Sequence, residues 1–509
     1  MKPNLFNSIK LMKPKNNVFD LTHDVKLSCD MGNLVPILAL ECVPGDKFKL
    51  SCESLIRFAP MTAPVMHRMD VSMHYFFVPN RILWSNWEKF ITDASSGVVA
   101  PYFNVFDGLT TAEKKFLDYM GVPPIPAGGT TTQISALPLS AYQCIYNEYY
   151  RDQNLIAPVD YKLVDGDNTN GTLVTQRKRA WEHDYFTASL PFAQKGDAVD
   201  IPLGNISVPT TKIQGRNTGG YTGVVLSNNG ESYGIDNLPA PIAGNGLYVP
   251  SINADVEPTT INDLRRAFRL QEWLEKNARG GTRYIESILT HFGVKSSDKR
   301  LQRPEYITGT KSPVVISEVL NTTGSFEAGD PESATSSPQG AMAGHGVSVT
   351  SGKYGNYYCE EHGYIIGIMS VLPKTAYQQG IPRTYLKNDT LDYFWPTFAN
   401  IGEQEVKNNE LYAYTGTGEN TFGYVPRYSE YKYMPSRVAG EFRSTLDYWH
   451  LGRIFATQPA LNQTFVECAP ANTKRIFAVT NEGTDSLYCH VLNKITAIRP
   501  MPKYGTPMI

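Results

Sequence analysis

Short apolar runs recur along the whole chain, and several have the pattern of β-strands. Residues 71–78 (VSMHYFFV) alternate between apolar and polar positions at first and then become apolar on both faces, as in a buried strand. Residues 34–43 and 364–372 are further apolar runs of strand length. A Pro-Gly-Asp turn at 44–46 separates the first of these from a strand expected at 48–52.

The C-terminal region predicts a β-hairpin. Residues 475–480 and 487–498 both have strand-like patterns. The segment between them, 481–485 (NEGTD), has the glycine and the polar residues of a five-residue hairpin loop. Strands are therefore expected at both ends of the chain and in its middle.

Helical patterns are fewer, and the clearest spans 262–279. Thr260 and Asp263 have the spacing of a capping box, and the glycine pair at 280–281 marks the end. Most apolar residues of this segment share one face of a helix. Trp273 lies off that stripe, so we expect a second surface to cover it.

Three further helices are expected in the first third of the chain. Thr110 and Glu113 form a second capping box, and Gly121 stands where a C′ glycine belongs. The other two predicted helices are 81–93 and 140–151.

Two long stretches have neither the alternation of a strand nor the apolar face of a helix. Between Gly204 and Gly246 there are nine Gly and six Asn in 43 residues, so we expect 195–258 to be a surface insertion of turns and short strands. Residues 322–352 are small and polar and predict a loop. Scattered antiparallel-type strands with long insertions and a few helices favour a mainly β jelly roll. An α/β fold would need helices that alternate regularly with strands.

Composition and charge narrow the class of protein. The 509 residues are 41% hydrophobic, which is enough for a sizeable core, and the formal net charge is −2. Any nucleic-acid contact must therefore come from local basic patches. The seven cysteines include no C-x-x-C motif and predict free thiols in a reducing compartment. No apolar run has the length of a signal peptide core or a membrane helix, so we expect no membrane insertion.

Motifs for catalysis and metal binding are weak. The chain has no P-loop and no H-E-x-x-H motif. Residues 165–171 (DGDNTNG) begin like a calcium loop but lack the required glycine and glutamate, so a polar turn is the simpler interpretation. The clusters at 182–184 (EHD) and 360–362 (EEH) have no partner nucleophile or second histidine at ligand spacing. We therefore predict no catalytic residue, no metal site and no cofactor.

Basic residues gather at both ends of the chain. The first 19 residues contain four lysines and no acidic residue, and no acidic residue follows Asp485. Cationic tails with nearby aromatics suit single-stranded nucleic acid, although a solubilising surface is the simpler interpretation of any one cluster. Further basic clusters lie at 177–179 and 295–303. The candidate DNA contacts are Lys2, Lys10, Lys13, Lys15, Arg499 and Lys503.

Tyrosine is abundant, with 30 residues, and many lie in polar segments that contain Pro or Gly. Pairs at 149–150, 357–358 and 412–414 and a triplet at 428–433 are examples. Amphipathic aromatics in loops often mark protein–protein interfaces. The pattern indicates a subunit that buries surface against copies of itself.

Four long segments resemble the major capsid proteins of the Microviridae, in the gokushovirus branch of small single-stranded DNA phages. They are 19–36 (FDLTHDVKLSCDMGNLVP), 57–87, 262–286 (NDLRRAFRLQEWLEKNARGGTRYIE) and 437–467. The resemblance covers most of the chain and is weakest across 195–258 and 322–352.

The resemblance implies an eight-stranded antiparallel viral jelly roll with long loop insertions and a few inserted helices. Residues 1–19 would be a basic arm, 20–194 and 259–509 the discontinuous core, and 195–258 a protrusion at the threefold axis. Sixty copies would form a T=1 icosahedral shell around circular single-stranded DNA. As the host-contact surface, the insertion offers the candidates Arg216, Tyr221, Asn228, Asn229 and Tyr233.

The same resemblance implies the partners and the place of assembly. The partners would be other copies of the chain, the DNA genome, a scaffolding protein, a DNA-pilot protein and a host surface receptor. Assembly would take place in the host bacterial cytoplasm, and the product would be the virion capsid. An alternative is a jelly-roll carbohydrate-binding or carbohydrate-active protein, which the aromatic content and the Asp165–Asp167 turn motivate.

Overall fold

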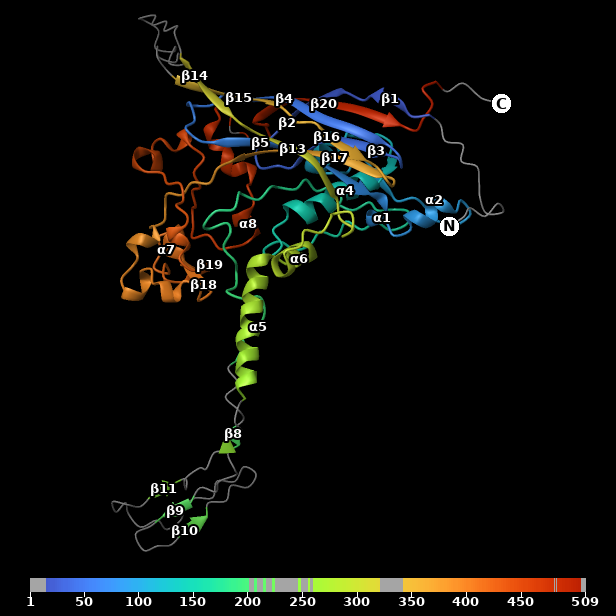
Figure 1. Cartoon of the computed structure of the whole chain (residues 1–509). Coiled ribbons are helices and arrows are strands. Elements are labelled where there is room, and N and C mark those ends of the chain that lie inside the picture. Colours follow the sequence, from blue (N-terminus) through green and yellow to red (C-terminus); the bar gives the residue numbers. More distant parts are fainter. Residues whose placement is uncertain are drawn as a thin grey trace, which may run out of the picture. The chain divides into compact units, whose positions relative to one another are not determined.

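The computed structural model describes residues 15–200, 260–320, 342–479, 481 and 483–504, with the backbone of five short strands between 201 and 259. The chain forms two compact units, one made of Met1–Ala193 and Ala278–Ile509 and the other of Gln194–Asn277. The larger unit is built around antiparallel β-sheets (Figure 1). A mainly β fold that is consistent with a jelly roll is therefore confirmed.

The first main sheet has seven antiparallel strands. They are β1 (Asn17–Asp20), β2 (His23–Cys29), β4 (Lys47–Phe58), β14 (Val315–Leu320), β15 (Met342–Ser351), β16 (Gly355–Tyr358) and β20 (Leu487–Arg499). The strand order is β1-β20-β4-β15-β14, with β2 also beside β20 and β16 also beside β4. The two longest strands, β4 and β20, thus form the centre of this sheet.

The second main sheet has four antiparallel strands in the order β13-β5-β17-β3. They are β3 (Val35–Cys42), β5 (Met69–Pro79), β13 (Glu305–Pro313) and β17 (Gly363–Pro373). The strands predicted at 34–43, 71–78 and 364–372 are confirmed as β3, β5 and β17.

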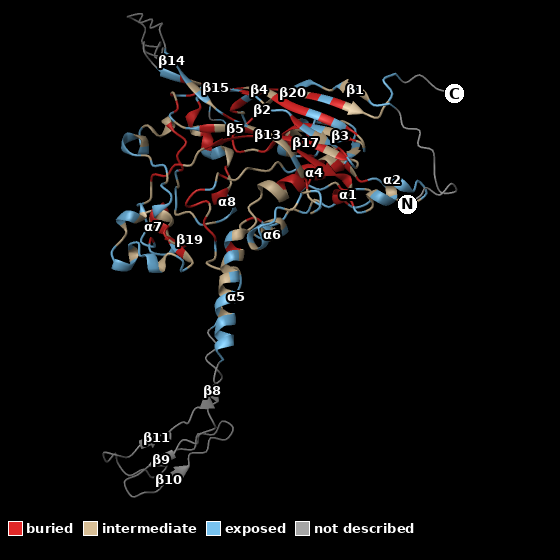
Figure 2. Ribbon diagram, viewed as in Figure 1, coloured by how far each residue is buried: buried red, intermediate tan, exposed pale blue. Residues whose placement is uncertain are grey.

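The main hydrophobic core joins the two sheets. Alternate residues of β4, such as Phe48 and Ile56, belong to the same buried cluster as Val71 of β5 and Val491 of β20. Figure 2 shows the buried parts of these strands in red. A polar link crosses this core, because the Tyr75 hydroxyl donates to Asn493 Oδ1 at 2.7 Å. The core therefore explains the period of two in these strands.

A helical layer covers the other face of the four-stranded sheet. Phe76 of β5 and Ile366 of β17 belong to a second buried cluster that includes residues of three helices in this layer. Because both faces of β5 and β17 are covered, these strands are apolar on both faces. The elements of this layer are α1 (Asn80–Leu83), α2 (Trp87–Thr92), β6 (Tyr102–Val105), α3 (Thr111–Tyr119), β7 (Thr132–Ser135), α4 (Leu137–Ile145) and the π-helix Tyr146–Tyr150.

The helix predictions in this layer are confirmed with changed boundaries. The Thr110 side chain accepts from the Glu113 amide and the Glu113 side chain from the Thr110 amide, as the capping box predicts. The helix expected at 81–93 is divided into α1 and α2, because the extended Trp84 ends α1. The helix expected at 140–151 begins earlier, as α4, and ends in the π-helical turn.

The predicted C-terminal hairpin is wrong. Pro470–Ile476 is a 3-10 helix, and the described residues 475–479 form no strand beside β20. The strand β20 pairs with β4 on one side and with β1 and β2 on the other, so no edge of it is free for a hairpin partner. The Lys474 ammonium instead donates to the Thr484 carbonyl at 2.9 Å and ties the turn together.

The loop predicted at 322–352 is wrong in its last part, which is β15, while 321–341 lie outside the described residues. The small residues of β15 have a steric reason. A Cβ atom on Gly344 would lie 2.4 Å from the Ala63 carbonyl oxygen, and one on Gly346 would lie 2.8 Å from the Met61 side chain. Glycine is needed here for close packing rather than for a loop.

A third buried cluster organises the segment between β17 and β20. It includes Phe186, Tyr377 and Val406, with the guanidinium of Arg453 packed over the Tyr377 and Phe465 rings. The elements of this lobe are β18 (Glu403–Lys407), α7 (Asn408–Leu411), β19 (Thr421–Pro426), α8 (Gln463–Val466) and short 3-10 turns, among them Thr390–Asp392 and Ser429–Tyr431. Before β13 lies α6 (Tyr284–Phe292).

The smaller unit contains most of α5 (Ile261–Gly280), which confirms the helix predicted at 262–279. The Thr260 hydroxyl accepts from the Asp263 amide at 3.2 Å and the Asp263 carboxylate accepts from the Thr260 amide at 3.3 Å, as its capping box requires. Trp273 remains 51% exposed, and its cover by a second surface stays a prediction. The backbone strands are β8 (Ile206–Ser207), β9 (Gln214–Arg216), β10 (Thr222–Val224), β11 (Gly246–Tyr248) and β12 (Asp255–Val256).

Candidate nucleic-acid interface

One face of the seven-stranded sheet lies against the core and the other is exposed. Since side chains alternate along a strand, the inward Phe48 and Ile56 of β4 leave Lys47, Lys49 and Arg57 on the outer face. The strand β2, which pairs with β20, adds the exposed Lys26. We call this outer surface the sheet face. It is built from β2, β4, β16 and β20.

An open groove of about 470 Å³ lies at one end of the sheet face. Lys47, Lys49, Tyr358 and Thr496 are among the residues that line it. The Lys47 Nζ atom lies 5.9 Å from the centroid of the Tyr358 ring, and Lys49 Nζ lies 4.4 Å from that of Tyr354. Each lysine thus stands beside an exposed aromatic ring.

A second groove, of about 530 Å³, lies toward the other end of the same strands. It is lined by Lys26, Leu55, Arg57, Tyr488 and His490, among others. Tyr488 is 48% exposed and pairs across the strands with Arg57. Both ends of the sheet face therefore combine exposed tyrosine rings with cations.

Much of the positive charge on the sheet face is uncompensated. The Lys494 ammonium hydrogen-bonds Glu53 at 2.5 Å, which raises the pKa of Lys494, and His490 Nε2 lies 2.9 Å from Asp24 Oδ1. Within the described part of the chain, the ion pairs within 4.0 Å do not include Lys26, Lys47, Lys49 or Arg57. These four cations can attract phosphate groups.

The described parts of both chain ends meet beside the sheet face. β1 pairs with the end of β20, so that Asn17 is opposite Arg499, and the Asn17 side-chain amide donates to the Met501 carbonyl at 2.7 Å. Lys15 and Lys503 are both exposed. The structure thus brings these two predicted contacts to one edge, whereas Lys2, Lys10 and Lys13 lie outside the described residues.

Arg499 is held by the protein itself. Its Nη2 atom donates to the Glu41 carbonyl at 2.8 Å, its Nε atom lies 3.4 Å from Asp46 Oδ2, and its guanidinium stacks over the Phe48 ring. Burial raises the pKa of Asp46, and the nearby Arg499 charge opposes that shift. A DNA contact by Arg499 stays a prediction, and its present contacts support the sheet edge.

The other basic clusters mainly make contacts within the chain. Arg177 donates to Gln143 Oε1 at 2.7 Å, and Arg179 donates to the Ser370 hydroxyl at 2.7 Å. In the 295–303 cluster, Lys299 pairs with Glu360.

The basic residues of β4 were missed by the sequence pattern, which pointed to these clusters and to the tails. The signal that could have found them is the period of two, which puts Lys47, Lys49 and Arg57 on one polar face.

The host-contact candidates fall on the least described part of the chain. Tyr221, Asn228, Asn229 and Tyr233 lie outside the described residues, and of Arg216 the structure gives the backbone of β9. Their role stays a prediction.

The acidic turn at 165–171 serves the fold. Asp165 Oδ1 accepts from the Trp84 indole at 2.8 Å, and Asp167 Oδ1 accepts from the Thr169 amide at 2.9 Å. Across the described ranges, no group of three His, Cys, Asp or Glu side chains could hold a metal ion. These carboxylates therefore fix Trp84 and a local turn.

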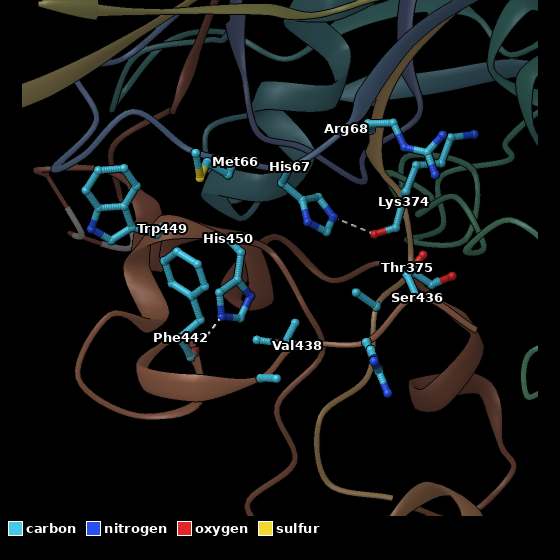
Figure 3. A pocket seen from close by; sticks show the side chains of 13 residues that line it. Met66, His67, Arg68, Lys374, Thr375, Ser436, Val438, Phe442, Trp449 and His450 are labelled. Atoms are coloured by element: carbon cyan, nitrogen blue, oxygen red, sulfur yellow. Dashed lines mark hydrogen bonds between the residues drawn. The ribbon is translucent and has the colours of Figure 1, made fainter. Parts of the chain in front are cut away.

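A pocket of about 270 Å³ brings two histidines near each other (Figure 3). His67 Nε2 lies 2.6 Å from the Lys374 carbonyl, and His450 Nε2 lies 2.7 Å from the Phe442 carbonyl (Figure 3). Burial lowers the pKa of His67 to about 4 and lowers that of His450 as well. Both rings are thus neutral donors to backbone carbonyls, which is a structural role.

All seven cysteines are free, as the sequence predicts, and all are buried. In the described part of the chain, no helix is long and apolar enough to cross a membrane. Two packed antiparallel sheets with long insertions and a basic, aromatic outer face suit a structural β-protein.

The comparisons with known proteins agree with this class. The family model described as "Capsid protein (F protein)" matches residues 8–509, so the chain belongs to this phage capsid protein family. The chain is 34% identical to capsid protein VP1 of Bdellovibrio phage phiMH2K, covering 99% of this chain and 97% of the relative. It is 33% identical to capsid protein VP1 of Chlamydia phage 1, covering 99% of this chain and 97% of the relative. It is 31% identical to capsid protein VP1 of Spiroplasma virus 4, covering 96% of this chain and 94% of the relative.

These relatives are gokushoviruses, which confirms the resemblance to the Microviridae. The protein is a structural major capsid protein and a component of the virion, and the family is not one of enzymes. Assembly with other copies into a shell follows from membership of the family.

Proposed function

We propose that sixty copies of this chain form a closed T=1 icosahedral shell around circular single-stranded DNA, with the sheet face toward the lumen. The observation that carries the orientation is the sheet face itself, where Lys26, Lys47, Lys49 and Arg57 stand beside exposed tyrosines. A surface of this chemistry suits a flexible strand of phosphates and unpaired bases.

The framework of the shell is an eight-stranded jelly roll. The supporting observation is the pairing order. One set of four strands is β2, β20, β4 and β15, and the other is β3, β17, β5 and β13. Numbered along the chain from β2, the eight strands give the orders 1-8-3-6 and 2-7-4-5, which are those of two interleaved Greek keys. The remaining strands of the first sheet extend its edges.

DNA would bind the sheet face in two ways. The cations neutralise phosphates, and each neutralised phosphate releases a counterion to the solvent. The rings of Tyr354, Tyr358 and Tyr488 offer stacking surfaces, each worth about 1–3 kcal/mol per base. Neither contact reads a sequence, which suits a shell that must accept every segment of a genome.

The chain ends extend the same surface. Lys15 and Lys503 leave the fold at the edge formed by β1 and β20, and Lys2, Lys10 and Lys13 precede Lys15 along the chain. We assign these tails to the lumen. The supporting observation is that both tails leave the fold beside the sheet face, whose cations attract phosphate groups.

The insertion 195–258 is assigned to the threefold protrusion and to host contact. Its composition of Gly, Asn and few charges suits an elaborate surface loop, and its host-contact candidates are those named above. A scaffolding protein, a DNA-pilot protein and a host receptor are the further partners, with assembly in the host bacterial cytoplasm.

The test combines electron microscopy with a measurement of packaged DNA. Lys47, Lys49 and Arg57 are changed together to Gln, and the control changes the exposed Lys89, Lys276 and Lys432, which lie on other elements, to Gln. We expect uniform closed particles from both variants and a lower DNA content per particle from the first. Equal DNA content in both would refute the assignment of the sheet face, and absence of closed particles from the wild type would refute the shell.

A further inference from the structure

The lobe between β17 and β20 exposes large apolar side chains in one place. Leu391, Tyr393, Phe394, Trp395 and Tyr431 are each 46–54% exposed. They gather around one another, with 6.2 Å between the ring centroids of Phe394 and Tyr431. We call these five residues the aromatic patch.

A buried ion pair supports the aromatic patch from below. Lys387 Nζ lies 3.4 Å from Glu430 Oε1, and the two side chains are 4% and 6% exposed. The same ammonium donates to the Tyr431 hydroxyl at 2.7 Å and lies 4.0 Å from the centroid of that ring and 5.5 Å from that of Tyr393. The lysine charge is therefore used inside the lobe, where it fixes the position of two rings of the patch.

A strained residue supports the patch at its other side. Tyr428 has a φ of 61°, in the left-handed region, which costs about 1–2 kcal/mol for a residue with a side chain. Its amide donates to Gln404 Oε1 at 2.9 Å, its hydroxyl accepts from the Trp395 amide at 3.2 Å, and its ring lies 4.9 Å from that of Phe394. Such strain persists where the surroundings define a conformation firmly, and it clusters at functional surfaces.

We propose that the aromatic patch is a contact between two copies of this chain in the capsid. Four aromatic side chains and a leucine, each about half exposed, offer roughly 500 Å² of surface. That is more than half of the roughly 800 Å² that each partner buries in a standard interface. Because the rings are already held in place, their burial costs little further side-chain entropy.

The chemistry of the patch favours protein over nucleic acid or sugar. The charge of Lys387 is taken up by Glu430, so this lysine offers no free cation to a phosphate. The rings of Tyr428 and Tyr431 meet that of Phe394 at 66° and 67°, so the cluster presents ring edges rather than one flat stacking platform. A second copy is the partner that membership of a capsid family guarantees in every assembled particle.

The first test compares oxidative footprints of assembled particles and free subunits. We expect the modification rates of Tyr393, Trp395 and Tyr431 to fall at least fivefold in particles. Tyr385, which is 75% exposed and lies outside the patch, is the internal reference. Equal rates at the patch in both states would overturn the proposal.

The inference rests on the proposed shell for the geometry of assembly, and the footprint separates the two. Closed sixty-copy particles with a fully reactive patch would overturn the proposal and leave the shell intact. Protection in assemblies of another form would support the proposal and refute the T=1 shell.

Matched variants test the energetic role. Trp395→Ser and Leu391→Ser should each raise the concentration at which subunits associate by at least tenfold, whereas Tyr385→Ser should change it less than threefold. A thermal melt of each variant checks that the lobe is folded. Unchanged association in a folded Leu391→Ser variant would overturn the proposal, as would glycan-array binding that depends on Trp395 while the patch stays reactive in particles.

Discussion

The sheet face makes a quantitative prediction about the salt dependence of DNA binding. Replacing Lys26, Lys47, Lys49 and Arg57 together by Gln removes four cations that have no carboxylate partner among the described ion pairs. The side chains stay polar and of similar length, and all four are exposed, so the fold should be retained. The variant therefore isolates charge.

The magnitude follows from counterion release. For single strands the slope of log K against log salt concentration is about −0.7 for each phosphate neutralised. If each of the four cations neutralises one phosphate, the variant should have a slope less steep by about 4 × 0.7, or roughly 3. Between 50 and 200 mM salt, the salt concentration rises fourfold. Over this range the DNA affinity of the wild type should fall about 50-fold to 60-fold more than that of the variant.

The assay is the binding of a fluorescent oligothymidylate to purified subunits across this salt range. The control variant changes Lys89, Lys276 and Lys432 to Gln and loses three exposed charges elsewhere. Its slope should remain close to that of the wild type. A sheet-face variant with the wild-type slope, or a control that loses as much as the sheet-face variant, would show that the DNA contacts lie elsewhere.

Three further predictions concern stability. Tyr75→Phe leaves the buried Asn493 without its donor and should lower the free energy of unfolding by about 1–3 kcal/mol, with an unchanged melting temperature as the contrary result. Thr110→Ala breaks the capping box with Glu113 and should cost about 0.5–2 kcal/mol in denaturant unfolding; no loss would mean that the box is energetically idle. Burial lowers the pKa of His67 from 6.5 to about 4. Between these two pH values the unfolded chain binds a proton at His67 that the folded chain does not bind. The free energy of unfolding should therefore fall by up to about 3 kcal/mol as the pH falls through this window. His67→Gln should flatten that pH profile, and a profile that keeps its full slope would assign it to other groups.

The strands of the core were predictable because burial imposes a period. The runs at 71–78 and 364–372 are apolar on both faces, and β5 and β17 are covered by the other sheet on one side and by the helical layer on the other. The capping boxes at Thr110 and Thr260 were equally clear, since they are local and need no tertiary contact.

The two wrong predictions depended on contacts between distant segments. β15 looks like a loop because its glycines and small residues resemble turn composition, yet Gly344 and Gly346 are needed where Ala63 and Met61 approach. The prediction of a C-terminal hairpin was wrong because β20 pairs with β4, more than 400 residues away in sequence, rather than with the segment just before it. No local pattern contains such information.

The candidate interface was predictable in part. The basic tails are visible in the sequence, and the structure places Lys15 and Lys503 at one edge. The sheet face was missed, because three cations of β4 are spread among apolar residues and join Lys26 and Tyr488 through pairing alone. A basic tail can be recognised in the sequence as a run of like charges. Cations on different strands come together only through strand pairing, which the sequence does not show directly.

An electron cryomicroscopy reconstruction of assembled particles tests the central claim most directly. The account predicts closed particles of sixty copies, in which β4 and β20 face the lumen and nucleic-acid density lies against Lys47, Lys49 and Tyr488. Particles in which this sheet face points outward, or in which the DNA density lies against another surface, would contradict it.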